Sequence, residues 1–165
     1  SYPFTIGWSF ASLTPPNSDK CQVRFDAKLA KERCLEGEGV RLSVQLENVA
    51  GEGKGLPMTI AVIGLPAGLK VPEDMKQLKQ MAMLQRNAAG EFESGEISFF
   101  EIRGRELILY WRDMKPGAKL DLAIDLIAEI PGEFRGPASR AYLYYNADHK
   151  WWSSPLKIAI EPRGN

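Results

Sequence analysis

The residues best suited to catalysis lie close together near the C-terminus. His149 is the only histidine in the chain, and it follows Asp148 directly. Two serines, Ser153 and Ser154, come a few residues later, and serine, histidine and aspartate together form the nucleophilic triad of many hydrolases. However, the sequence has no Gly-x-Ser-x-Gly nucleophile elbow, and these residues occupy a polar stretch between two apolar runs. We therefore predict a polar loop without catalytic residues, in a protein that is not an enzyme.

A pair of glutamates is a second arrangement to consider as an acid–base site. Glu101 and Glu106 lie on either side of Gly104. Arg103 and Arg105 stand between them, so each carboxylate has an arginine close by in the sequence. Exposed pairs of opposite charge are common and contribute little to stability. We interpret the two glutamates as surface charges or members of local ion pairs.

The two cysteines admit two interpretations. Cys21 and Cys34 are separated by twelve residues. They either form a disulfide or remain separate thiols on different strands, and geometry decides, because Cα atoms more than about 7 Å apart cannot be bridged. One histidine and two cysteines are too few for a typical zinc site. We therefore predict no metal and no cofactor.

The composition is that of an ordinary globular domain. Hydrophobic residues make up 44% of the 165 positions and charged residues 25%, which suits one domain. The 21 basic and 21 acidic residues cancel, whereas a nucleic-acid-binding surface requires a basic excess. No apolar run reaches the roughly 18 residues of a membrane-spanning helix, and the first residues lack a signal-peptide pattern. We expect no nucleic-acid partner, no membrane span, and either a mature protein or a piece of one.

Most of the chain alternates apolar runs of strand length with turns rich in glycine and proline. Residues 40–46 show the clearest alternation, as in a strand with one buried face. Residues 58–65 are almost continuously apolar, which suits a central strand. Strands at such spacing indicate an all-β antiparallel sandwich, here of about seven to nine strands. The other predicted strands cover residues 1–13, 23–29, 95–102, 105–112, 119–129, 139–145 and 155–161.

Only residues 72–86 follow helical periodicity. Pro72 suits a first helical position, and Glu73 and Asp74 suit the positive end of the helix dipole. Arg86 suits the opposite end. We therefore predict one short helix that crosses over between strands. The face expected to pack on the sheet consists of Met75, Leu78 and Ala82.

The N-terminal residues are predicted to stand apart from the main domain. Residues 14–20 contain Pro15 and Pro16 together with asparagine, serine and aspartate, a composition typical of a linker. The apolar alternation before this linker is that of a strand with one buried face. We divide the chain into residues 1–20, a strand and linker of a preceding domain, and residues 21–165, the main domain. The alternating apolar residues are Phe4, Ile6, Trp8 and Phe10.

Several short motifs follow one another in a recognisable order. A strand ending in asparagine precedes an apolar strand with a corner of proline and glycine, then the helix and a Tyr-Trp strand. Two Pro-Gly turns, a Gly-Pro turn and a tyrosine-rich strand complete the series. The motifs are residues 40–48, 58–68, 72–86, 110–112, 116–117, 131–132, 136–137 and 139–145. The series resembles the C-terminal macroglobulin-like domain of the alpha-2-macroglobulin family, called receptor-binding in vertebrate members, and is closer to bacterial or divergent members.

This resemblance implies an all-β macroglobulin-like sandwich and a non-catalytic interaction domain of a protease-trapping protein. Such a protein is extracellular, secreted or periplasmic. The domain docks on other domains of the same parent chain and becomes exposed when cleavage rearranges the parent; in some members it then binds a cell-surface receptor. The target protease is a partner only through the parent protein. The family's thioester motif, Gly-Cys-Gly-Glu-Gln, is missing around Cys21 and Cys34, so no thioester chemistry is expected in this chain.

The resemblance also singles out lysines of the predicted helix. In vertebrate members, a pair of lysines on this helix engages receptors related to the low-density-lipoprotein receptor. Lys76 and Lys79 are three positions apart and therefore share a helix face, and Lys70 lies just upstream. The other interpretation is a solvated helix face, which is the usual place of a surface lysine.

The C-terminal third is rich in aromatic side chains. They either form a platform for a carbohydrate or another ligand, or pack in the core or between domains, with hydroxyls bonded to nearby turns. We expect Ser139 and Tyr145 to make structural hydrogen bonds of this kind. The aromatic cluster comprises Tyr142, Tyr144, Tyr145, Trp151 and Trp152.

Two functions of other classes stay open. A stand-alone adhesion or carbohydrate-binding sandwich would present Trp151 and Trp152 on a flat exposed patch. A hydrolase accessory domain would place His149 within hydrogen-bond reach of both a serine and Asp148.

Overall fold

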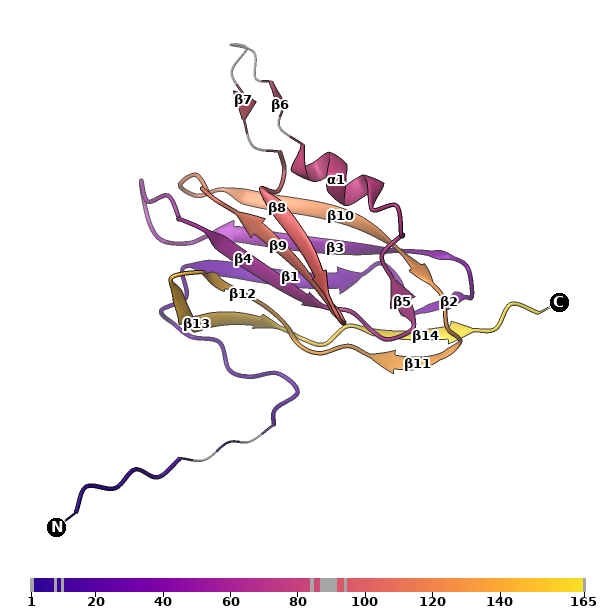
Figure 1. The fold of residues 1–165 in the computed structure, drawn as a ribbon, viewed down its shortest axis with the longest axis horizontal. Coiled ribbons are helices and arrows are strands. Elements are labelled where there is room, and N and C mark those ends of the chain that lie inside the picture. Colours follow the sequence, from indigo (N-terminus) through magenta and orange to yellow (C-terminus); the bar gives the residue numbers. More distant parts are fainter. Residues whose placement is uncertain are drawn as a thin grey trace.

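The described part of the chain folds into a β-sandwich with one short helix (Figure 1). The computed structural model describes residues 2–7, 9, 11–83, 85–86, 92–93 and 95–164. One sheet has the order β1 (Val23–Leu29), β3 (Gly39–Asn48), β10 (Lys119–Ala128) and β5 (Leu69–Lys70). The five-stranded sheet has the order β13 (Asn146–Ser153), β12 (Ser139–Leu143), β4 (Thr59–Gly64), β9 (Glu106–Trp111) and β8 (Phe99–Arg103).

A smaller sheet and a hairpin complete the described elements. The small sheet has the order β11 (Gly132–Arg135), β14 (Lys157–Glu161) and β2 (Arg33–Leu35). Its β14 and β2 are parallel, whereas the strands of the two larger sheets pair antiparallel. The helix α1 (Lys76–Ala82) precedes a two-stranded ladder of β6 (Gln85–Arg86) and β7 (Phe92–Glu93).

The alternation predicted for residues 40–46 is confirmed. In β3, every second side chain is buried and those between are exposed, except for the half-buried Glu47. β10 runs antiparallel beside β3 and faces it in register, so the two strands supply one continuous apolar layer to the core. The buried residues are Val40, Leu42, Val44 and Leu46 of β3, with Leu122, Ile124, Leu126 and Ala128 of β10.

Several strands form where the sequence pattern predicted turns or loops. β13 replaces the polar loop expected around His149, and the prediction of a loop there is wrong. β13 pairs with β12 and is otherwise an edge strand, so its side chains lack the apolar alternation by which strands are recognised. β11 likewise forms inside a predicted turn, because it pairs with β14.

The helix is shorter than the predicted residues 72–86. It has seven residues, and Met75 precedes it in a left-handed backbone conformation with φ 49°. Pro72 therefore lies outside the helix, and no acidic residue occupies the first turn, so both of these predictions are wrong. Arg86 belongs to β6, because the chain leaves the helix at Met83 and pairs with β7 instead.

The strand expected in residues 1–13 is not present among its described residues. These residues carry no strand and run away from the sandwich (Figure 1). Phe4 and Ile6 are 82% and 76% exposed, so the predicted buried face is open. A single extended segment has no ladder to join unless another strand lies beside it. Trp8 and Phe10 lie outside the described residues.

Both cysteines are buried free thiols, which settles the choice left open by the sequence. The thiol of Cys21 donates to the carbonyl of Val23 at 3.4 Å. Cys34 lies in β2 of the three-stranded sheet, whereas Cys21 precedes β1. Burial raises the pKa of each thiol, so both are kept in their less reactive, protonated form.

The chain is closely packed where β4 ends. A Cβ on Gly64 would lie 2.2 Å from the carbonyl oxygen of Pro137, and one on Gly136 would lie 2.6 Å from the oxygen of Gly64. The buried hydroxyl of Ser139 accepts the N–H of Gly64 at 3.0 Å. The structural hydrogen bond predicted for Ser139 is therefore confirmed. Tyr145, for which the same role was predicted, is instead exposed.

Gly64→Ala should lower the melting temperature strongly. The added methyl group has no room beside Pro137, and forced overlap in a packed core costs about 1–3 kcal/mol or more. Thermal unfolding followed by circular dichroism measures the loss. Gly39→Ala is the matched control, because nothing lies within 4 Å of a Cβ placed there. An equal loss in both variants would contradict the close approach.

Candidate interaction surfaces

The structure separates the residues that resembled a hydrolase triad. His149 lies on β13, and its Nδ1 is 3.0 Å from the Oγ of Ser18 in the linker. Ser153 Oγ donates to Oδ1 of Asp26 at 2.9 Å. Among the described residues, no hydrogen bond joins His149 to Asp148 or to Ser153. The histidine and the serine thus make separate structural contacts, one to the linker and one to β1.

Both glutamates belong to ion pairs, but only that of Glu101 is the local pair that the sequence suggested. Glu101 accepts hydrogen bonds from the hydroxyl of Tyr110 and from Arg103, whose Nη2 lies 3.0 Å away. Glu106 accepts from Nη1 of Arg140 at 2.8 Å. Arg140 comes from β12, so this partner is distant in the sequence. The two carboxylates therefore serve different partners and do not act as an acid–base pair.

Within the described part of the chain, no three or more histidine, cysteine, aspartate or glutamate side chains are grouped to hold a metal ion. Its helix is also too short and too polar to span a bilayer.

The candidate lysines lie on the exposed side of α1 and just before it. Nζ of Lys76 is 3.1 Å from a carboxylate oxygen of Asp74, and Nζ of Lys79 donates to the carbonyl of Asp74 at 3.0 Å. Lys70 pairs with Glu129, which follows β10. The structure therefore gathers Lys76 and Lys79 around one aspartate, whereas Lys70 is bound to a different element.

On the opposite side of α1, Leu78 and Ala82 pack on the core as predicted, whereas Met75, the third residue of the predicted face, precedes the helix, and Met81 packs there instead. Leu78 is only 1% exposed, and Met81 and Ala82 pack partly buried against the core. Lys76 and Lys79 are exposed. Burial of one face therefore orients the helix so that its lysines meet solvent.

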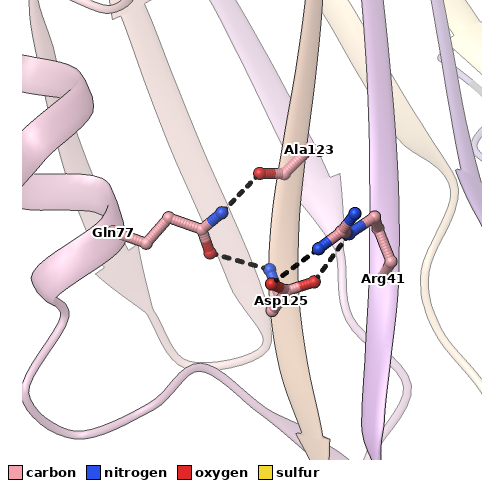
Figure 2. Close-up of polar contacts among 4 residues, drawn as sticks. All are labelled: Arg41, Gln77, Ala123 and Asp125. Atoms are coloured by element: carbon pink, nitrogen blue, oxygen red, sulfur yellow. Dashed lines mark hydrogen bonds and ion pairs between the residues drawn. The ribbon is translucent and has the colours of Figure 1, made fainter.

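Gln77 fastens the helix to the open edge of β10 (Figure 2). Its Nε2 donates to the carbonyl of Ala123 at 2.6 Å, and its Oε1 accepts the N–H of Asp125 at 2.8 Å. Because β5 pairs only with the last residues of β10, this stretch has no neighbouring strand on that side. The amide group takes the place of the missing strand. No sequence pattern predicts such a contact.

An ion pair beside Gln77 joins β10 to β3. Nε of Arg41 lies 2.8 Å from one oxygen of Asp125, and Nη2 lies 3.1 Å from the other (Figure 2). The guanidinium hydrogen bonds lower the pKa of Asp125 and raise that of Arg41. Both side chains are exposed, so the pair fixes the geometry of the strands more than it stabilises them.

The outward side of the five-stranded sheet carries an apolar centre that the sequence analysis did not identify. Ile60 and Val62 of β4 and Ile108 of β9 are buried there, in a cluster separate from the main core. Tyr110 and Tyr142 pack against them. The register pairs Ile60 with both tyrosines, and Val62 with Ile108, so the five side chains share one face. The only sequence signal was the unbroken apolar run of β4, which indicates burial on both sides.

Cationic side chains cover the margin of this apolar centre. The guanidinium of Arg140 lies 5.6 Å from the ring of Trp152 and also bonds Glu106. Nζ of Lys150 lies 5.4 Å from the ring of Tyr142. Cations over aromatic faces are attracted by the ring quadrupole. We name this surface the outer face; it comprises Ile60, Val62, Phe99, Ile108, Tyr110, Arg140, Tyr142, Lys150 and Trp152.

Tyr110 connects the outer face to the edge strand β8. Its ring centroid lies 5.9 Å from that of Phe99, which is 60% exposed. Its hydroxyl donates to the carboxylate of Glu101. The pKa of Tyr110 is raised to about 12, mainly by burial and next by this hydrogen bond. The same hydrogen bond lowers the pKa of Glu101, with a further contribution from Arg103.

The five aromatic candidates do not form one cluster. Tyr142 and Trp152 belong to the outer face, whereas Trp151 packs partly buried against the main core. Tyr144 and Tyr145 follow β12 and are 54% and 81% exposed, with ring centroids 5.1 Å apart. Both tryptophans are half-buried, so they do not make the flat exposed patch expected of a carbohydrate platform.

A groove of about 930 Å³ lies beside β1 and the segment that joins β13 to β14. Trp151 lines it, with the guanidinium of Arg24 lying 5.9 Å from its ring. Most of its charged groups are paired with one another rather than aimed at a common point, as catalysis requires. The pairs along the groove are Asp26–Lys28, Glu47–Lys119 and Gln45–Asp121.

Comparison with known proteins identifies the fold. No protein-family model matches the sequence, and no curated protein matches it. Trypsin-activated alpha-2-macroglobulin from Escherichia coli superposes with a TM-score of 0.65 at 15% identity, over 93% of this chain and 11% of that chain. Salmonella alpha-2-macroglobulin reacted with methylamine gives a TM-score of 0.63 at 16% identity, over 93% and 10%. The major pilin subunit of Bacillus cereus gives 0.55 at 12% identity, over 87% and 41%.

The chain therefore has the macroglobulin-like sandwich fold that the sequence predicted. It spans about a tenth of the length of the macroglobulin chains it superposes on.

Leu78→Ala should lower the free energy of unfolding by about 2–5 kcal/mol, as expected for a buried leucine that leaves a cavity. Lys76→Ala should change it by less than about 0.5 kcal/mol, because the lysine is exposed. Urea unfolding of the two variants measures both values. Losses of similar size would show that Leu78 does not anchor the helix.

Tyr110→Phe should flatten the loss of stability at alkaline pH. The pKa of Tyr110 is raised from 10.0 to about 12 in the folded protein, so the native state holds this proton more tightly than the unfolded chain does. The resulting stabilisation is complete below about pH 10 and is lost as the pH rises through about 12. Urea unfolding at a series of pH values measures the slope. Parallel curves for the two proteins would contradict a partly buried hydroxyl that is hydrogen-bonded to Glu101.

Proposed function

We propose that this chain is a non-catalytic interaction domain of an alpha-2-macroglobulin-like protease-trapping protein, and that it docks on neighbouring domains of the same parent chain. The observation that carries the proposal is the outer face, where exposed Phe99 and the half-buried rings of Tyr110, Tyr142 and Trp152 lie beside cationic side chains, as aromatic and charged groups do in protein–protein interfaces. The fold likeness to a small part of much longer macroglobulin chains supports a domain of a larger protein.

The residue types of the outer face suit binding. Tyrosine, tryptophan and arginine dominate the energetics of protein interfaces, because they combine a large contact area with polar groups that fix orientation. Tyr110, Tyr142, Trp152 and Arg140 are of these types. Their partners within the domain already hold them in place, which lowers the entropy lost on docking.

Further parts of the proposal follow from the family resemblance. Residues 1–20 join the domain, residues 21–165, to the preceding part of the chain. Cleavage of the parent by its target protease exposes the domain, and the lysines of α1, Lys76 and Lys79, with Lys70 beside them, then engage a cell-surface receptor. The parent is extracellular, secreted or periplasmic.

A stand-alone adhesion or carbohydrate-binding sandwich is the second candidate. The exposed pair of Tyr144 and Tyr145 favours it, because aromatic rings in water are common binding platforms. The fold likeness to a pilin subunit is compatible with it.

Phe99→Asp should weaken docking at least tenfold. The measurement is calorimetric titration of this chain with the rest of its parent protein, expressed separately. Phe99 lies in the outer face and is exposed, so the charge disturbs the interface more than the fold. Tyr145→Asp is the matched control, because it adds the same charge at an exposed aromatic outside the outer face.

Equal affinities of the two variants would remove the outer face from the docking site. A glycan that binds the unmodified chain but not Tyr145→Asp would favour the second candidate instead. The receptor step has its own test, since Lys76→Ala combined with Lys79→Ala should abolish receptor binding without lowering the melting temperature.

A further inference from the structure

The strand β11 is an open edge of the three-stranded sheet. It pairs with β14 on one side, and it lies at the lower rim of the sandwich in Figure 1. Residues that bond across an antiparallel ladder alternate with residues whose backbone groups point away from it. The N–H of Gly136 donates to the carbonyl of Leu156 across this ladder at 2.9 Å, so the backbone groups of Glu133 and Arg135 point to the open side. Within the described part of the chain, no hydrogen bond is made to these groups.

The side chains of the same two residues face solvent. Phe134 packs against the core, so its neighbours on either side project outward, and both are exposed. Arg135 lies directly opposite Lys157 of β14, in a pair of the kind that is not hydrogen-bonded and brings side chains close together. Like charges directly opposite each other destabilise a sheet. Among the described residues, no ion pair includes Arg135, Lys157 or Glu133, so the arginine has no carboxylate to offset this repulsion.

The order of the two charges on β11 is complementary to itself. When a second β11 lies antiparallel beside the first, with the two Phe134 residues opposite each other, each Glu133 faces the Arg135 of the other copy. The outward backbone groups belong to the same residues, so this register also lets them exchange N–H···O=C hydrogen bonds. Each Arg135 then gains a carboxylate on its open side. A two-fold contact has this requirement, because the same patch must fit itself.

The charges disfavour other ways of pairing the two edges. A parallel pair in register places glutamate beside glutamate and arginine beside arginine. An antiparallel pair centred on Glu133 or on Arg135 places two like charges opposite each other. Short, charged edge strands usually protect a sheet from pairing with other chains. Here the charges oppose these arrangements and favour the antiparallel pair centred on Phe134.

We propose that β11 is a self-association surface, through which two copies of this chain form a two-fold dimer with their three-stranded sheets joined edge to edge. The surface is separate from the outer face, so the proposal goes beyond the docking function and does not depend on it. Two strands of four residues make a smaller contact than the standard interface of about 1,200–2,000 Å². The dimer therefore forms at high protein concentration and dissociates on dilution.

An exchange of charges tests the register. Glu133→Arg leaves β11 with two cations, and Arg135→Glu leaves it with two carboxylates. Each variant alone should associate at least about tenfold more weakly than the unmodified chain, because like charges then meet across the interface. An equimolar mixture of the two variants should dimerise again, because every cross-strand pair joins opposite charges. Sedimentation equilibrium over a series of concentrations measures each association.

The fold of the variants is checked by thermal unfolding. Arg135→Glu should raise the melting temperature of the monomer, because it replaces a like charge opposite Lys157 by an opposite one. Lys115→Glu is the matched control, because it reverses an exposed charge between β9 and β10 and should leave association unchanged. An unmodified chain that stays monomeric at every concentration would overturn the proposal. So would a mixture that stays monomeric, a dimer that survives in either variant alone, or an equal loss of association in the control.

Discussion

The architecture depends on how the open edges of its strands are satisfied. A backbone N–H or C=O at a sheet edge needs a hydrogen-bond partner, and an uncovered edge invites pairing with another chain. In this domain side chains supply these partners. Gln77 bonds the edge of β10, Asn17 bonds that of β13, and Ser153 accepts the N–H of Ala27 at the edge of β1. The same three contacts position the helix, the linker and the turn before β14.

A second constraint is the burial of β4 on both of its sides. All six of its residues are buried. An antiparallel sheet usually presents polar residues to water on its outer side, but here Ile60 and Val62 point outward. Tyr110 and Tyr142 cover these two side chains, and Arg140 and Lys150 lie around the margin. The outer face therefore contributes to stability, and under the proposed function one substitution there affects both stability and docking.

These constraints decide which candidate residues make contacts within the fold and which of them face solvent. His149 and Ser153 form hydrogen bonds that join β13 to the linker and to β1. The two glutamates form ion pairs. The lysines of α1 remain available to a partner, because Leu78 and Gln77 hold the other side of the helix against the sandwich.

The sequence by itself determined the sandwich, the alternating strands such as β3, the existence of one helix and its buried Leu78. Each of these depends on the period of apolar residues within a single element, which is visible locally. The tertiary structure alone decided that β13 is a strand, that Gln77 meets Ala123, and that Ile60 lies between two tyrosines. These contacts join residues far apart in the chain, and their partners follow from strand register and sheet order. A local pattern of hydrophobicity states which side of a strand is apolar, but not which distant residue will lie beside it.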